Sequence, residues 1–314
     1  MDWNIANKTE FQIHQYLFTR YLGSGSTGTV YECLNMITDV KYACKVMKIT
    51  DCYDDSFFNH FRDEILIHSQ LVHPCIAQIR DLIIDDNYMY FILDLCENGD
   101  LNEYVQENQG LSEEEAKVIF YQIMTALSYL HNNNIAHRDI KLENILISSD
   151  GKIKLADFGL SKKKIDKMVT VCGTLVYAPP EILSGYPYDG IKADIWSAGI
   201  LLYAMIACHF PWEADENLSN EEIIKETVEQ IKEGRVNPLE TDDFNLLDLM
   251  ASMLNIDPES RPSSTEILQH PWFRDLNQNV HSETLSTNNN ITNVVKQFLA
   301  NIEAIRMKHK QGII

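Results

Sequence analysis

Two short stretches decide how this chain is interpreted: His137-Arg138-Asp139-Ile140-Lys141-Leu142-Glu143-Asn144 and, further on, Asp157-Phe158-Gly159. Phosphoryl transfer needs a carboxylate at the attacking hydroxyl and oxygen ligands for the hard Mg²⁺ ion. Asp139 offers that carboxylate, while Asn144 and Asp157 offer an amide oxygen and a second carboxylate. Either stretch alone could arise by chance. Their order, downstream of two further features, is typical of a site for phosphoryl transfer.

The first of these features is a glycine-rich stretch, Leu22-Gly23-Ser24-Gly25-Ser26-Thr27-Gly28-Thr29-Val30. Glycines at this spacing let backbone N–H groups approach phosphate oxygens closely, which a Cβ atom would prevent. The same spacing also occurs at dinucleotide sites and in plain hairpins. A predicted strand, not a helix, follows the last glycine, which argues against a dinucleotide site but leaves the hairpin open.

The second feature is Lys45, which follows Ala43 and Cys44 on a predicted strand. An isolated lysine on a strand is usually just solvated. Glu64, however, lies nineteen residues further on, inside a predicted helix. A lysine that holds two phosphates needs a carboxylate to fix its flexible side chain. We therefore expect Lys45 and Glu64 to form a pair.

Hydrophobic patterning divides the chain into two parts of different character. The first hundred residues are predicted to be mostly strands, at 16–22, 29–33, 40–49 and 88–95, with one helix at 57–71. Short strands are predicted near 145–146 and 153–155. Helices are predicted at 112–131, where Ser112 and Glu115 suggest a capping box, and at 196–205, 221–231, 244–254 and 264–270. This pattern indicates an α+β protein with a β-rich part followed by a helical part.

The chain resembles the protein kinase family over residues 16–273, nearly all of a catalytic domain. Lys141 matches the serine/threonine branch, and His270-Pro271-Trp272-Phe273 is similar to the domain ending of the calcium/calmodulin-dependent and AMP-activated group. The resemblance implies a bilobal fold, with a small β-rich N-lobe at 16–93 that carries one key helix, a hinge at 94–98 and a larger α-helical C-lobe at 99–273. Residues 1–15 would be an N-terminal extension, and 274–314 a C-terminal tail.

The same resemblance implies roles for the site residues, with ATP and Mg²⁺ as cosubstrate and metal. Asp139 would accept the proton of the substrate hydroxyl, and Lys141 would meet the γ-phosphate. Asn144 and Asp157 would bind Mg²⁺, and Lys45 would contact the α- and β-phosphates. The nucleotide would be held by Leu22, Gly23, Ser24, Gly25, Gly28, Val30, Ala43, Lys45, Glu64, Leu93, Asp94, Cys96 and Asp157. Its adenine would bond the backbone of residues 94–96, behind Leu93.

Other matching positions imply structural roles. Thr174 would bond the catalytic Asp139, Glu181 would pair with Arg261, and Asp194 would brace the catalytic loop. The sequence also departs from the family pattern: Thr27 replaces the usual aromatic residue at the tip of the glycine loop, Pro179 replaces the usual alanine, and Cys44 replaces a small aliphatic residue. None of these departures removes a group that the chemistry needs.

Two acidic positions suggest a substrate preference. Asp100 and Glu143 match positions that, in kinases preferring basic substrates, receive arginine three and two residues before the target. The resemblance therefore implies a preference for Arg-x-x-Ser/Thr sequences. The alternative is that both residues are simply surface acids of an acidic protein.

One threonine suggests control by an upstream kinase. Thr170 lies four residues before Thr174, where the AMP-activated group carries its regulatory threonine. His60, Arg138 and Lys162 match positions that would surround a phosphate on Thr170. Charge-assisted bonds to that phosphate would draw helix and loops together.

The tail contains an apolar stripe at helical spacing, within about residues 291–307. Its members are Ile291, Val294, Val295, Phe298, Leu299, Ile302 and Ile305. The simpler interpretation is a helix packed on the large lobe. The alternative, suggested by basic residues at Lys296, Arg306, Lys308 and Lys310, is a regulatory or calmodulin-binding helix.

Composition argues against several other classes of protein. The formal net charge is −20, which argues against a nucleic-acid binder. The 7 cysteines are scattered without a C-x-x-C pair, which suits a reducing cytoplasm, with nuclear access left open. The start of the chain is not predicted to be a signal peptide, and no apolar run approaches the roughly 18 residues of a membrane span.

Two other functions would use a related fold. A pseudokinase would act as a scaffold without transferring phosphate, but such proteins typically lack the equivalents of Lys45, Asp139 or Asp157, and all three are present. A small-molecule kinase would lack the substrate-docking segment found at 174–181. We expect an active enzyme that acts on protein substrates.

Overall fold

The computed structural model describes residues 11–25, 28–159, 161–163, 175–212, 218–276 and 289–311. They divide into two compact units. Unit 1 lies within Met1–Val72, Ala77–Glu97 and Leu285–Ile314, and unit 2 within His73–Ile76 and Asn98–Thr284.

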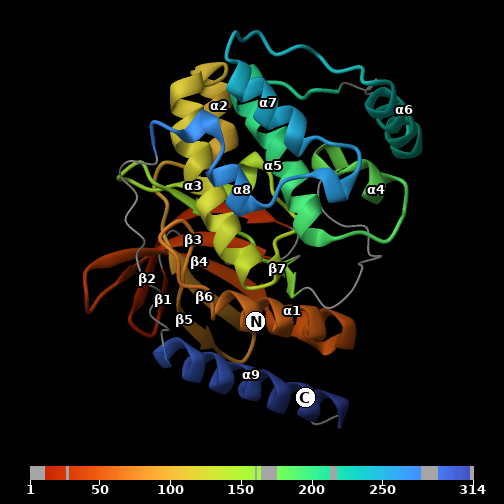
Figure 1. The fold of residues 1–314 in the computed structure, drawn as a ribbon. Coiled ribbons are helices and arrows are strands. Elements are labelled where there is room, and N and C mark those ends of the chain that lie inside the picture. The colour runs from red at the N-terminus through yellow and green to blue at the C-terminus, as the bar shows by residue number, and fades with distance from the viewer. Residues whose placement is uncertain are drawn as a thin grey trace. The chain divides into compact units, whose positions relative to one another are not determined.

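Unit 1 is built on a six-stranded antiparallel sheet (Figure 1). The strands follow the spatial order β1-β2-β3-β4-β6-β5. Their bounds are β1 Phe11–Ile13, β2 Tyr16–Gly25, β3 Gly28–Asn35, β4 Val40–Lys48, β5 Ile79–Ile84 and β6 Tyr88–Asp94. Strands β1 and β5 were not predicted from the sequence.

Both faces of this sheet are buried, and strand alternation assigns each residue to a face. On β6, Met89 and Phe91 belong to one hydrophobic cluster, while Tyr90 and Ile92 belong to another. The first cluster contains residues of helix α1, and the second is closed mainly by aromatic side chains of β2 and β3. On β4, Met47 belongs to the cluster with α1, and Lys45 shares its face by the same alternation.

Helix α1 (Asp55–His68) follows the short 3₁₀ helix η2 (Ile49–Tyr53). The side chain of Asp54 accepts a hydrogen bond from the backbone N–H of Phe57 (2.7 Å) and so caps the first turn. Phe58, Phe61 and Ile65 are buried at helical spacing against the sheet. Each such side chain contributes about 1.5–3 kcal/mol of burial free energy.

The predicted tail helix exists, as α9 (Asn289–Lys310), but the interpretation that it packs on the large lobe is wrong. It belongs to unit 1, where it contacts β5, η2 and α1 (Figure 1). The physical reason is the apolar face of β5 and α1, which unit 1 would otherwise leave uncovered on that side.

Unit 2 is mainly helical. Its helices are α2 (Leu101–Asn108), α3 (Glu113–Asn132), α4 (Pro180–Leu183), α5 (Gly190–Ala207), α6 (Asn220–Glu233), α7 (Phe244–Met253) and α8 (Ser264–Leu268). Its 3₁₀ helices are η3 (Leu142–Asn144), η4 (Leu175–Tyr177), η5 (Pro258–Ser260) and η6 (Pro271–Phe273). Two small antiparallel sheets pair β7 (Ile135–Ala136) with β10 (Lys162–Lys163), and β8 (Ile145–Ile147) with β9 (Ile153–Leu155).

Helices α3 and α5 form the centre of unit 2. Helix α3 begins after Ser112. As the sequence predicts, the Ser112 hydroxyl caps the helix by accepting a hydrogen bond from the backbone N–H of Glu115 (3.3 Å). Helix α5 is, within the described residues, the one helix long and apolar enough to cross a membrane, but 72% of it is buried inside the protein. That burial is what the core helix of a globular unit requires.

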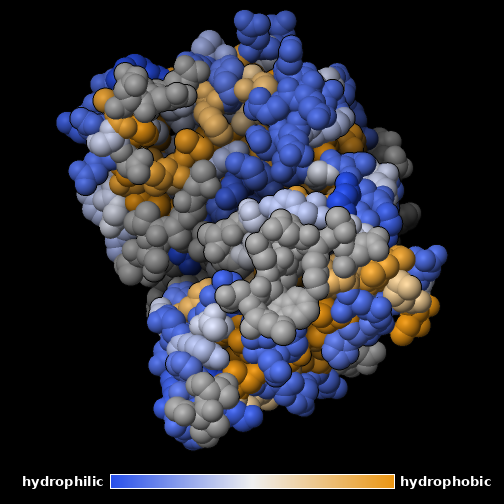
Figure 2. Space-filling model, turned by 180° about the vertical axis from the view of Figure 1, so that it is seen from behind, coloured by the Kyte–Doolittle hydropathy of each residue, from blue (hydrophilic) through white to orange (hydrophobic). Residues whose placement is uncertain are grey.

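The α+β prediction is confirmed, with most of the described strands in unit 1 and most of the described helices in unit 2. Figure 2 shows one face of the molecule, on which hydrophilic side chains predominate and hydrophobic ones form smaller patches. This surface agrees with the strongly acidic composition, which carries a formal charge of −20.

Candidate active site

The glycine-rich stretch forms the hairpin between β2 and β3. Gly25 pairs with Gly28, and Ser26 and Thr27 lie outside the described residues. A Cβ at Gly28 would lie 2.5 Å from the carbonyl oxygen of Val46, so the packing of β3 on β4 requires glycine there. A Cβ at Gly23 would meet nothing within 4 Å. Protein packing therefore does not require glycine at position 23, and the close approach of a ligand would.

The other nucleotide residues of unit 1 lie on its sheet and on α1. Val30 of β3 pairs with Lys45 of β4, and Ala43 pairs with Leu93 of β6. Lys45 and Glu64 are both half-buried. The pairing of Lys45 with Glu64 stays a prediction.

The predicted adenine segment begins at the end of β6. The backbone N–H of Asp94 donates to the carbonyl of Gln78 (3.1 Å), and its carboxylate binds Arg80 (2.5 Å). The N–H of Asp94 is thus already used within unit 1. Cys96 lies further on and is partly exposed. Adenine binding by the backbone of residues 94–96 stays a prediction.

The catalytic loop of unit 2 is fastened by Asp194 at the start of α5, as predicted. One carboxylate oxygen of Asp194 accepts the backbone N–H of His137 (2.8 Å), and the other accepts that of Arg138 (2.7 Å). His131 of α3 contacts the first oxygen (3.0 Å), and Asp194 is only 1% exposed. The loop is therefore held by two backbone hydrogen bonds to one buried carboxyl group.

His137 fixes the loop from its other side. Its Nε2 lies 3.0 Å from the carbonyl oxygen of Ala156, and its Nδ1 accepts the backbone N–H of Asp139 (3.3 Å). The ring is fully buried and packs edge-on against Phe158. Burial lowers the pKa of His137, so the ring is neutral and its Nδ1 is free to accept.

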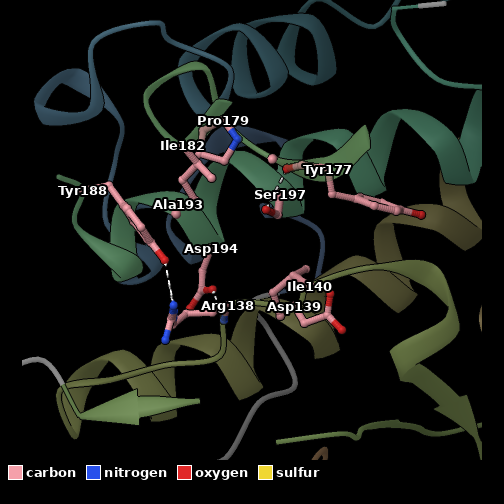
Figure 3. A pocket seen from close by; sticks show the side chains of 11 residues that line it. Arg138, Asp139, Ile140, Tyr177, Pro179, Ile182, Tyr188, Ala193, Asp194 and Ser197 are labelled. Atoms are coloured by element: carbon pink, nitrogen blue, oxygen red, sulfur yellow. Dashed lines mark hydrogen bonds between the residues drawn. The ribbon is translucent and has the colours of Figure 1, made fainter. Parts of the chain in front are cut away.

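The Asp139 carboxylate is held by two donors. Its Oδ2 atom lies 2.9 Å from Lys141 Nζ and 3.0 Å from Asn144 Nδ2. The Asp139 side chain is only 10% exposed, so these contacts are partly shielded from water. The carboxylate points away from that of Asp194 (Figure 3). The loop thus presents one oriented carboxylate.

Asn144 and Asp157 fit an Mg²⁺ site by their chemistry. Asn144 Nδ2 donates to both the backbone oxygen (2.8 Å) and the side chain of Asp139, which leaves its amide oxygen for another partner. Asp157 is exposed and adopts φ +56°, in the left-handed region that non-glycine residues rarely adopt. An amide oxygen and a carboxylate are the hard ligands that Mg²⁺ prefers.

A pocket lies beside the catalytic loop and reaches to the start of α5 (Figure 3). On one side of it, the Arg138 guanidinium donates to the Tyr188 hydroxyl from Nε (3.2 Å) and from a terminal nitrogen (2.9 Å). Arg138 also has φ +71°, in the left-handed region that non-glycine residues rarely adopt. Tyr188 was not singled out from the sequence, because no local pattern links it to a residue fifty positions away.

The predicted substrate residues both lie in unit 2. Asp100 caps α2 by accepting the backbone N–H of Glu103 (2.9 Å), and Glu143 is exposed on η3. Asp100 also forms an isolated bridge with Leu146, which directly follows η3 and Ile145. The structure therefore places the two acidic residues on neighbouring segments.

The predicted regulatory residues are described only in part. Thr170 and Thr174 lie outside the described residues, and only the backbone of Lys162 is described, where it pairs with Ala136. His60 is exposed on α1 of unit 1, where its Nδ1 lies 2.7 Å from the carbonyl of Ser56. The phosphate site stays a prediction.

The predicted pair of Glu181 and Arg261 is confirmed. The guanidinium reaches both carboxylate oxygens, at 2.7 and 2.8 Å. It also donates to the backbone oxygens of Asn255 (2.8 Å) and Lys192 (3.0 Å), and it lies 4.9 Å from the ring of Trp196. Arg261 is 1% exposed. Through Arg261, this network joins Glu181 of α4 to Lys192 and Trp196 of α5.

Comparison with known proteins agrees with this geometry. The sequence model described as "Protein kinase domain" matches residues 16–273. The chain belongs to the protein kinase family. It is 37% identical to the SNF1-related protein kinase catalytic subunit alpha KIN12 of Arabidopsis thaliana, over 85% of this chain and 53% of that protein.

Two further relatives are also kinases by name. The chain is 35% identical to the carbon catabolite-derepressing protein kinase of Secale cereale, over 83% of this chain and 52% of that protein. It is also 35% identical to the human NUAK family SNF1-like kinase 2, over 82% of this chain and 40% of that protein. The chain thus spans about half the length of these relatives or less.

Proposed function

We propose that this protein transfers the γ-phosphoryl group of ATP to serine or threonine hydroxyls of other proteins. The observation that carries the proposal is the Asp139 carboxylate, oriented by Lys141 and Asn144 on a loop that Asp194 fastens. The match to the protein kinase family and the protein kinases among the relatives support it.

The chain's own residues divide the work of phosphoryl transfer. Asp139 accepts the proton of the attacking hydroxyl. Lys141, whose Nζ lies 2.9 Å from Asp139 Oδ2, contacts the γ-phosphate with its positive charge. Asn144 and Asp157 would hold Mg²⁺, and the ion would supply positive charge that neutralises the phosphates. The backbone of the glycine hairpin covers the phosphates, and Lys45 contacts them.

A pseudokinase scaffold is the competing proposal. Every group that the transfer needs is present, and the loop is already held in one conformation by buried hydrogen bonds. Phosphorylation of a peptide set by the intact chain, with Mg²⁺-ATP and with EDTA as control, distinguishes the two. Transfer that EDTA abolishes supports the enzyme. No transfer, even after treatment with an activating kinase, favours the scaffold.

We expect the same peptide set to reveal a preference for arginine three and two residues before the target. Asp100→Asn keeps the helix cap, because asparagine also caps well, but removes the charge. It and Glu143→Gln should each weaken the preference about two- to fivefold, as for an exposed ion pair. The control is Glu114→Gln, which changes an exposed acid of α3. A peptide profile without upstream basic residues would contradict this proposal.

We expect Thr170→Ala to lower kcat about tenfold or more after treatment with an activating kinase, because the phosphate would bring new charge-assisted bonds to Arg138. Thr287→Ala, in the tail, serves as the control. The measurement is kcat with a fixed peptide, before and after treatment. Full activation of the Thr170→Ala protein would reject this mechanism.

A further inference from the structure

The apolar stripe of α9 is covered within unit 1. Ile291, Val295, Phe298 and Ile302 are buried and share one cluster with Phe58, Phe61 and Ile65 of α1 and with residues of β5 and β6. The ring of Phe298 packs edge-on against that of Phe91, with 5.7 Å between their centroids. A calmodulin-type partner would therefore have to displace α9 before it could bind the same stripe.

Arg306 closes the end of this interface and is only 5% exposed. Its Nε donates to the backbone oxygen of Cys52 in η2 (2.6 Å), and a terminal nitrogen pairs with the Asp55 carboxylate in the first turn of α1. The guanidinium carbon also lies 3.8 Å from the ring centroid of Phe58. One side chain thus joins α9 to η2 and to the first turn of α1.

Neighbouring residues of α9 reinforce the same end of α1. Lys310 Nζ lies 2.7 Å from an oxygen of Asp55. The rings of His309 and Tyr53 stack, with 3.9 Å between centroids. Arg306, His309 and Lys310 of α9 therefore converge on the segment 52–58. Lys308 lies on the same helix and is exposed.

A buried guanidinium is expensive to desolvate, and simple packing would be served as well by an apolar side chain. The bonds of Arg306 are all directed at η2, at the start of α1 and at Glu303 of its own helix. A rigid helix transmits this constraint along its length, and Glu64 lies on α1 further along. Small displacements of a residue that orients phosphate contacts cost large factors in rate.

We propose that Arg306 is a positioning residue for phosphoryl transfer: it fixes the start of α1, and with it Glu64, relative to the strand that carries Lys45. The proposal rests on the proposed function, in which Glu64 orients Lys45 at the α- and β-phosphates. The residues after the catalytic domain thereby become part of the working enzyme.

The test uses the full chain and three variants. Arg306→Met keeps the length of the side chain but removes its charge and hydrogen bonds, Arg306→Lys keeps the charge, and Lys308→Met makes the same kind of change at an exposed position. Initial rates are measured well below the unfolding temperature, with ATP and peptide varied separately. Amide hydrogen exchange of residues 55–68 is measured on the same samples.

Arg306→Met should lower kcat/KM for ATP about tenfold, which is the scale of a lost charged hydrogen bond. The KM for peptide should stay unchanged, and exchange in α1 should become faster. Arg306→Lys should recover part of the loss, and Lys308→Met should behave as the unaltered chain. A kcat/KM for ATP that stays the same or rises would overturn the proposal, even if the melting temperature falls.

Failure of the proposed function would look different. The unaltered chain would then transfer no phosphate, and the comparison would use the Kd of Mg²⁺-ATP together with hydrogen exchange. Weaker nucleotide binding and faster exchange in Arg306→Met would still support positioning. An unchanged Kd in that variant would overturn it.

Discussion

Replacement of Asp139 by asparagine is expected to lower kcat for peptide phosphorylation by about 10²–10⁴-fold, the contribution of a positioned general base. An amide has nearly the shape of the carboxylate, and its oxygen can still accept from Lys141 and Asn144. It cannot accept the proton of the attacking hydroxyl. The loss should therefore lie in kcat, with the KM for ATP little changed.

The control for this experiment is Asp86→Asn, which changes an exposed acid in the turn between β5 and β6. Both proteins should give the same far-ultraviolet circular dichroism and the same unfolding midpoint as the unaltered chain. If Asp139→Asn kept more than a tenth of the original kcat, Asp139 could not be the base of this reaction.

The parts of the site that sequence reasoning found are those whose chemistry is local. Asp139, Lys141 and Asn144 lie within six residues of one another, and the structure joins their side chains directly. The longer-range pair of Glu181 and Arg261 was also predicted, but only through the resemblance to a family. No spacing along the chain indicates that residues eighty positions apart will meet.

The burial of Arg306 could be predicted from the sequence only in part. Arg306 follows Ile302 by four residues, so helical spacing places it on the apolar stripe. Its charge instead suggested, with the neighbouring lysines, a regulatory or calmodulin-binding helix. Burial is possible because Asp55 and the Cys52 carbonyl, more than 250 residues away, supply its partners. Such partners exist only once unit 1 has folded.

The unpredicted elements have similar causes. Strand β5, with the sequence Ile-Arg-Asp-Leu-Ile-Ile, breaks strict alternation because both of its faces are buried: Leu82 lies in the cluster that contains α9, and Ile83 lies in the other cluster. Tyr188 is an ordinary aromatic residue in sequence, and its contact with Arg138 depends on how α5 meets the catalytic loop. Tertiary contacts, not local propensity, decide both features.

The second large effect concerns stability. Arg261→Met should lower the free energy of unfolding of unit 2 by about 3–5 kcal/mol, because removal of one partner leaves a buried charge uncompensated. The partner left behind is Glu181, whose side chain is 12% exposed, and the carbonyl oxygens of Asn255 and Lys192 also lose their donor. Urea unfolding followed by tryptophan fluorescence suits the measurement, since the guanidinium lies against Trp196.

The chain contains its own matched control in Arg235, which pairs with Glu233 at 2.5 Å while both side chains are about 60% exposed. Arg235→Met should cost less than about 1 kcal/mol, because water screens an exposed pair. The double variant Glu181→Gln with Arg261→Met should recover part of the lost stability, since no buried anion then remains. Equal losses of unfolding free energy in Arg261→Met and Arg235→Met would show that burial does not set the strength of the pair between Glu181 and Arg261. Contacts other than this pair would then hold α4 to α5.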